Sequence, residues 1–163
     1  MAREDEEGGD KVIRLRMTCS GVVQAVGFRP AVHRFAVSLG LAGWVRNDAD
    51  GATIEVEGSD KAVRAFQYRL AEVLPPLARL DTAVVSETAA LGTRGFTVAL
   101  SADGPRSRAL IPPDTVLCGD CRREMDDPSD RRFRYPFTTC TNCGPRYSLT
   151  RALPYDRERT SMQ

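Results

Sequence analysis

Four of the five cysteines in this chain have the spacing of metal ligands. They form two CxxC pairs, Cys118 with Cys121 and Cys140 with Cys143. Two thiolates spaced in this way can chelate one ion, and two such pairs complete the tetrahedron of a structural zinc site. A redox-active CxxC is the alternative, but no thioredoxin-like sequence surrounds either pair. The cysteines therefore predict one structural zinc ion per chain.

A second candidate site lies in residues 21–29, where the segment GVVQAVGFR joins a predicted strand to a predicted helix. Backbone N–H groups in such a loop can point towards an anion, and the helix N-terminus adds partial positive charge. Arg29 offers a planar guanidinium that matches two phosphate oxygens. Asn47, near the end of a later strand, can hold a water molecule through its amide. These residue types alone are also compatible with an ordinary structural turn.

The predicted phosphate-binding loop consists of Gly21, Val22, Val23, Gln24, Ala25, Val26, Gly27 and Phe28. The only histidine, His33, follows Arg29 by one helical turn, and we interpret it as a surface or packing residue instead of a catalytic base.

The elements that would position these residues can be read from the hydrophobic periodicity. Residues 12–18 alternate as a half-buried strand, and the segment after Pro30 has helical spacing and ends at Gly40. A hairpin around the DADG turn, a second helix that begins at Ser59 or Asp60, and the strand candidates LDTAVVSE and GFTVAL follow. The order is β-α-β-β-α-β, with room for a short extra strand. This order predicts an α+β fold, a ferredoxin-like βαββαβ sandwich with two helices on one face of an antiparallel sheet.

Composition sets limits on the partners of the protein. The 163 residues include 23 basic and 22 acidic ones, so the net charge of +1 predicts no general attraction to nucleic acid or membranes. The acidic N-terminus does not resemble a signal peptide, and the apolar runs are too short to cross a bilayer, so we expect a cytoplasmic protein. The predicted organisation is a disordered acidic tail, a sandwich domain, a linker, a zinc-finger module and a C-terminal segment, at residues 1–11, 12–101, 102–113, 114–150 and 151–163.

Residues 12–100 resemble the acylphosphatase family. The segment GVVQAVGFR resembles the signature G-x-V-Q-G-V-x-F-R, and GWVRNDADG resembles the second signature, a glycine and an aromatic residue followed by V-x-N-x-x-x-G. The resemblance implies that Arg29 binds an acyl phosphate and that Asn47 positions the attacking water, with no metal needed for hydrolysis. Ala25 replaces a glycine of the first signature, and Thr53 replaces a valine. We expect strain at Ala25 if that position has a positive φ.

The two halves in this order resemble the HypF family of carbamoyltransferases, which mature NiFe hydrogenases. This resemblance implies carbamoyl phosphate as substrate, carbamate and phosphate as products, and a chain that is a fragment of a longer protein. It also implies later ATP-dependent carbamoyl-transfer domains and a hydrogenase-maturation partner protein. Residues 151–163 would then begin a second zinc repeat. If ligands come from adjacent CxxC pairs, the site here is complete, whereas interleaved repeats would leave it unfinished.

Two other functions remain open from the sequence. Basic and aromatic residues near the cysteines could form a zinc-dependent nucleic-acid-binding module, although acidic residues are interleaved with them. The basic and aromatic residues are Arg122, Arg123, Arg131, Arg132, Arg134, Phe133, Tyr135 and Phe137. The other possibility is an interaction scaffold that binds phosphate but has weak catalysis because of Ala25.

Overall fold

The computed structural model describes residues 11–102, 116–144 and 149–161. The predicted N-terminal tail and the predicted linker lie almost wholly outside these ranges.

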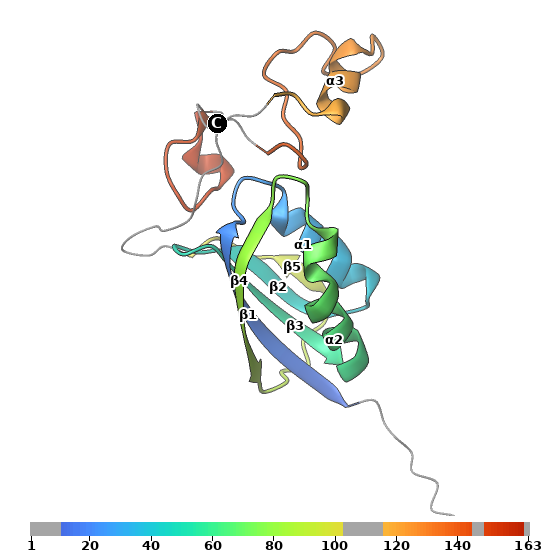
Figure 1. Cartoon of the computed structure of the whole chain (residues 1–163), viewed down its shortest axis with the longest axis vertical. Helices are drawn as coiled ribbons and strands as arrows, with labels where there is room; N and C mark the ends of the chain where they lie inside the picture. Colours follow the sequence, from blue (N-terminus) through green and yellow to red (C-terminus); the bar gives the residue numbers. More distant parts are fainter. Residues whose placement is uncertain (1–10, 103–115, 145–148, 162–163) are drawn as a thin grey trace, which may run out of the picture.

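The N-terminal half is built on one five-stranded sheet (Figure 1). Its strands are β1 (Val12–Val22), β2 (Ala42–Asn47), β3 (Ala52–Ser59), β4 (Arg79–Thr88) and β5 (Phe96–Val98), in the spatial order β4-β1-β3-β2-β5. The pairs β1–β3, β1–β4 and β2–β3 are antiparallel. The short strand β5 pairs with β2 in parallel, so the sheet is mixed where the sequence predicted an antiparallel one.

Two helices, α1 (Phe28–Ser38) and α2 (Asp60–Arg69), cover one face of this sheet (Figure 1). The Ser59 hydroxyl accepts a hydrogen bond from the Ala62 N–H, as expected for a helix N-cap. Gly40 follows α1 with a φ of 66°, which confirms its predicted place at the helix end. After α2, residues Leu70–Val73 continue as a 3-10 turn.

The core lies between the helices and the sheet. The apolar side of β1 is buried as its alternation predicted, and it includes Leu15, Met17 and Cys19. Phe35 of α1 stacks on Phe66 of α2 with ring centroids 5.3 Å apart. Burial, with a smaller contribution from Asp48, raises the pKa of the Cys19 thiol to about 12. This cysteine is therefore protonated at neutral pH and lies apart from the other four.

The opposite face of the sheet carries a buried ionic cluster. Arg14 of β1 donates to the carboxylates of Glu55 and Glu57 on β3, and all three residues are less than 5% exposed. The Leu91 and Thr93 N–H groups, from the connection between β4 and β5, donate to Glu57 at 2.8 and 3.1 Å. Burial alone would raise the pKa of Glu57, but the Leu91 N–H and the Arg14 guanidinium outweigh it and hold the pKa below its ordinary value.

The C-terminal part contains little regular structure. Helix α3 (Gly119–Asp126) follows Cys118, a 3-10 turn spans Arg157–Arg159, and an antiparallel bridge joins Thr150 to Thr160. Among the described residues, no helix is both long and apolar enough to cross a membrane.

Candidate anion site and metal centre

Residues 21–28, the candidate anion loop, run from the last two residues of β1 to the first residue of α1, and three of them have positive φ values. Gly21, Ala25 and Gly27 have φ values of 119°, 61° and 75°. Residues at such angles turn successive N–H groups towards one side, where they can surround an anion. Ala25 therefore has the left-handed conformation expected if it replaces a glycine, at a cost of about 1 kcal/mol.

Arg29 and Asn47 approach the loop from two elements. Arg29 lies in the first turn of α1, and Asn47 is the last residue of β2 and is 1% exposed. The Nη2 of Arg29 and the Nδ2 of Asn47 both donate to the carbonyl oxygen of Tyr155, at 2.8 and 3.1 Å. The buried Oδ1 of Asn47 has no hydrogen-bond partner among the described residues. The two side chains thus converge on one oxygen atom, which belongs to the backbone of this chain.

Gln24 joins the loop to the turn that follows β2. Its Nε2 donates to the carbonyl oxygens of Asp48 and Gly51, each at 2.7 Å, and its Oε1 accepts from the Tyr155 N–H at 2.9 Å. Thr53 holds the same turn, because its hydroxyl donates to the Asp48 carboxylate at 2.5 Å. Thr53 therefore has a structural role at a position where the family signature has valine.

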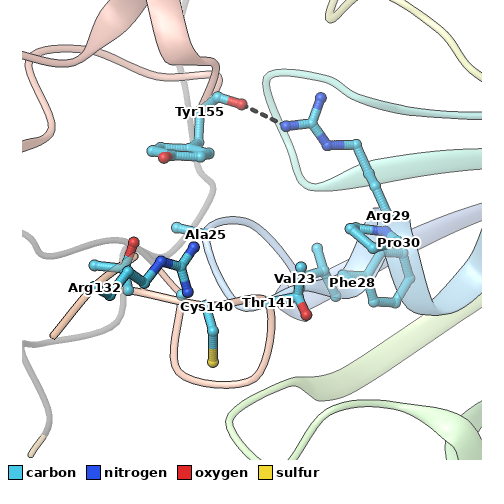
Figure 2. Close-up of a pocket in the computed structure, with 12 residues that line it drawn as sticks. Val23, Ala25, Phe28, Arg29, Pro30, Arg132, Cys140, Thr141 and Tyr155 are labelled. Carbon is cyan, nitrogen blue, oxygen red and sulfur yellow. Dashed lines mark hydrogen bonds between the residues drawn. The ribbon is translucent and has the colours of Figure 1, made fainter. Parts of the chain in front are cut away.

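The loop opens into a cavity of about 470 Å³ (Figure 2). It shares this cavity with residues 116–144, which contain the four paired cysteines and are called the cysteine segment. The loop contributes Ala25 and Gly27 to the cavity, and the cysteine segment contributes Arg132 and Thr141. A molecule bound in this cavity would therefore contact both halves of the chain.

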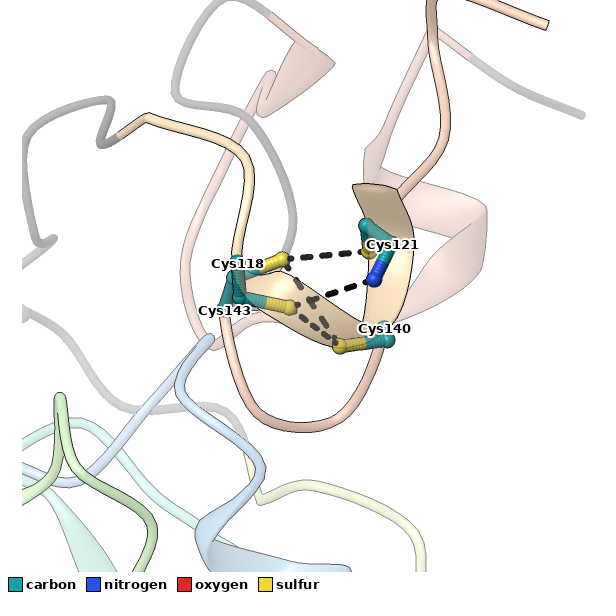
Figure 3. A group of neighbouring side chains, drawn as sticks. All are labelled: Cys118, Cys121, Cys140 and Cys143. Carbon is teal, nitrogen blue, oxygen red and sulfur yellow. Dashed lines mark hydrogen bonds between the residues drawn. The ribbon is translucent and has the colours of Figure 1, made fainter. Parts of the chain in front are cut away.

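The four paired cysteines come together around one point (Figure 3). Their Sγ atoms all lie within 4.8 Å of one another, with separations of 3.4 Å for Cys118–Cys140, 3.7 Å for Cys121–Cys143 and 3.8 Å for Cys140–Cys143. A zinc ion about 2.3 Å from each sulfur would place the sulfurs about 3.8 Å apart. The residues therefore fit a four-thiolate metal site, and adjacent CxxC pairs supply all four ligands.

The titration of these thiols reflects their crowding. Burial alone would raise the pKa of Cys118, but the Cys121 N–H and the neighbouring thiols outweigh it and lower the pKa to about 7. Burial and the same neighbours raise the pKa of Cys121. A bound divalent cation would favour four thiolates.

The second cysteine pair packs directly on the anion loop. A Cβ added to Gly27 would lie 1.7 Å from the Thr141 carbonyl oxygen, and one added to Gly144 would lie 1.7 Å from the Ala25 carbonyl oxygen. Both glycines have positive φ values. The absence of a side chain at these two positions is what lets the two backbones approach so closely.

Sequence reasoning missed the contribution of residues 150–160 to the site. Residues 151–163 were assigned only as the start of a second zinc repeat, and the contacts of Tyr155 and Asp156 with Arg29 were not expected. Asp156 follows Arg29 by 127 positions in the chain, and no local spacing or periodicity reports on such a contact.

The arginines near the cysteines are largely paired with acids. Arg122 pairs with Asp126, Arg123 with Asp120 and Arg132 with Glu124. The interleaved charges predicted from the sequence thus meet as local ion pairs on this surface.

The fold and the anion loop define the class of protein. The profile of the acylphosphatase family matches residues 15–98, and the chain belongs to this family. The acylphosphatase of Thermotoga maritima is 40% identical over 85 residues, which cover 52% of this chain and 93% of that enzyme. The crystal structure of acylphosphatase from Bacillus subtilis aligns with a TM-score of 0.51 and 32% identity, covering 53% of this chain and 98% of that one.

The similarity continues through the cysteine segment to one group of larger enzymes. The HypF finger profile matches residues 117–150. Carbamoyltransferase HypF2 of Cupriavidus necator is 49% identical over 154 residues, which cover 93% of this chain and 19% of that protein. The crystal structure of full-length HypF in its phosphate- and nucleotide-bound form aligns with a TM-score of 0.88 and 41% identity, over 93% of this chain and 20% of that chain. The chain thus matches the N-terminal part of HypF carbamoyltransferases and spans about a fifth of their length.

Proposed function

We propose that this chain hydrolyses an acyl phosphate, carbamoyl phosphate, to carbamate and phosphate. The observation that carries the proposal is the convergence of Arg29 Nη2 and Asn47 Nδ2 on one oxygen atom beside the loop. The same atoms would meet a phosphoryl oxygen or the attacking water of a substrate. The similarity to acylphosphatases and to HypF carbamoyltransferases supports both the reaction and the substrate.

Arg29 and the N–H groups of residues 21–28 would hold the phosphoryl oxygens and stabilise their charge in the transition state. Asn47 would orient a water molecule, because its buried Oδ1 is an acceptor with no partner among the described residues. Attack by that water forms a new P–O bond while the bond between phosphorus and the acyl oxygen breaks. Carbamate leaves with the electrons of that bond. Positioning and charge stabilisation carry this mechanism, and no covalent intermediate is needed.

We propose that Cys118, Cys121, Cys140 and Cys143 hold one zinc ion with a structural role. In a longer protein, the carbamate would pass to ATP-dependent carbamoyl-transfer domains that act in hydrogenase maturation with a partner protein. We further propose the unit boundaries expected from the sequence, an acylphosphatase-like domain at 12–101 and a zinc-finger module at 114–150. The left-handed Ala25 is the observation that favours the alternative, a phosphate-binding scaffold with weak catalysis.

Steady-state hydrolysis of carbamoyl phosphate tests the proposal. We expect Arg29→Ala and Asn47→Ala each to lower kcat/KM about 100- to 1000-fold. Arg29→Lys should recover only part of this loss, because an ammonium group cannot make the planar two-point contact. Arg34→Ala is the matched control, since it removes one positive charge from an exposed position of the same helix.

Near wild-type rates in either alanine variant would remove that residue from the mechanism. A wild-type chain that binds phosphate but does not turn over carbamoyl phosphate would favour the scaffold.

A further inference from the structure

The loop of residues 150–160 reaches into the anion site. Its ends are held together by the Thr150–Thr160 bridge and by the Arg151 N–H, which donates to the Arg159 carbonyl oxygen at 2.8 Å. Its tip, Tyr155 and Asp156, contacts Arg29, and Figure 2 shows the hydrogen bond between Tyr155 and Arg29.

The tip occupies the donors that a phosphate would need. Arg29 Nη1 donates to Asp156 Oδ1 at 2.9 Å, and Arg29 Nη2 donates to the Tyr155 carbonyl oxygen at 2.8 Å. Asn47 Nδ2 donates to that same carbonyl oxygen. A carboxylate oxygen and a carbonyl oxygen thus sit side by side on one guanidinium, which is the arrangement that two phosphoryl oxygens take on an arginine.

We propose that the tip of the 150–160 loop is an internal competitor for the anion site, which phosphate must displace to bind through both Nη atoms of Arg29. This inference rests on the proposed function, because it assumes that Arg29 is the phosphate-binding residue. A ligand oxygen cannot share the two N–H groups that point at Asp156 Oδ1 and at the Tyr155 carbonyl oxygen while the tip is in place, so a two-point contact through those N–H groups requires the tip to leave.

The hydrogen bonds that hold the tip at the anion site can break and form again. The Arg29 and Asp156 side chains are 17% and 33% exposed, so water can replace their bond as it breaks. The Tyr155 N–H is anchored to Gln24 Oε1 and would be freed when the tip leaves. The apparent dissociation constant for phosphate is then the intrinsic constant divided by the fraction of molecules with an open site.

Calorimetric titration of the full chain with inorganic phosphate tests the competition. We expect Asp156→Ala to tighten phosphate binding about tenfold, because the variant populates the open site more. Glu158→Ala is the matched control, since it removes one negative charge from an exposed position of the same loop. It should change the affinity by less than about twofold, which separates local competition from general charge repulsion.

Hydrogen exchange of the wild-type chain supplies a second measurement that needs no variant. Saturating phosphate should speed exchange of the Tyr155 amide, because displacement breaks its bond to Gln24. Unchanged or weaker phosphate binding in Asp156→Ala, or a Tyr155 amide that stays protected with phosphate bound, would overturn the competition and make Asp156 a residue that orients Arg29.

Arg29→Ala separates a failure of the proposed competition from a failure of the proposed function. If it abolishes phosphate binding while Asp156→Ala has no effect, only the competition fails. If phosphate binds equally well without Arg29, the proposed function fails as well.

Discussion

The close approach of the anion loop to the cysteine segment can be tested by adding one methyl group. In Gly27→Ala the new Cβ would lie 1.7 Å from the Thr141 carbonyl oxygen, and this backbone atom cannot turn aside as a flexible side chain could. Gly27 also has a φ of 75°, which an alanine adopts at a cost of about 1 kcal/mol. The structure therefore predicts two separate penalties, one conformational and one steric.

Gly40→Ala isolates the conformational penalty. Gly40 has a φ of 66°, and a Cβ added there meets nothing within 4 Å. We expect Gly40→Ala to lower the free energy of unfolding by about 1 kcal/mol. The overlap in Gly27→Ala should add about 1–3 kcal/mol, a total of about 2–4 kcal/mol.

Urea denaturation followed by the fluorescence of Trp44, the only tryptophan, measures both variants on the same sheet. Gly144→Ala tests the contact from the other side, because its Cβ would lie 1.7 Å from the Ala25 carbonyl oxygen. Limited proteolysis should show the cysteine segment cut faster in Gly27→Ala and Gly144→Ala. If Gly27→Ala matches Gly40→Ala in both stability and cleavage pattern, the two backbones do not pack as the structure shows.

Three further predictions concern the loop, the metal and the ionic cluster. Ala25→Gly should raise the free energy of unfolding by about 0.5–1 kcal/mol in the same denaturation assay, since glycine adopts a φ of 61° freely. It should also raise the affinity for phosphate or the rate of hydrolysis. Unchanged stability, affinity and rate would show that Ala25 is unstrained. Metal analysis should find one zinc ion per chain. A chelator should make the cysteine segment sensitive to protease, while the sheet stays folded and still binds phosphate. A metal-free cysteine segment that resists protease would refute the zinc site. Folding lowers the pKa values of Glu55 and Glu57. The stability that the two carboxylates contribute is therefore fully present above their unfolded pKa of about 4.3, and it is lost as the pH falls through their pKa values in the folded chain. Urea denaturation between pH 6 and pH 3 should show this loss, and Glu57→Gln should reduce it; an equal pH dependence in the variant would assign the loss to other groups.

The sheet and helices could be predicted because they depend on local pattern. The period-two alternation of β1, the helical spacing that ends at Gly40, and the Ser59 cap all report on neighbours within one or two turns. Arg29 and Asn47 could be named because the segments around them resemble the two acylphosphatase signatures. The four cysteines could be grouped because the CxxC spacing is itself a chelating geometry.

The surroundings of these residues were decided by tertiary structure. Arg14 belongs to the polar side of a strand in the sequence pattern, yet in the structure it is buried and pairs with Glu55 and Glu57 of the neighbouring strand. The parallel pairing of β5 was likewise unpredictable, because a three-residue strand carries too little pattern to show its direction.

The anion site shows the same division most clearly. Residue types and the resemblance to the two signatures predicted which atoms would bind a phosphate, because hydrogen-bonding capacity is a property of each side chain. Only the folded chain decided that Tyr155 and Asp156 lie on those atoms and that Thr141 closes over Gly27. Contacts over more than a hundred residues depend on how separate elements pack, and no local sequence pattern encodes that packing.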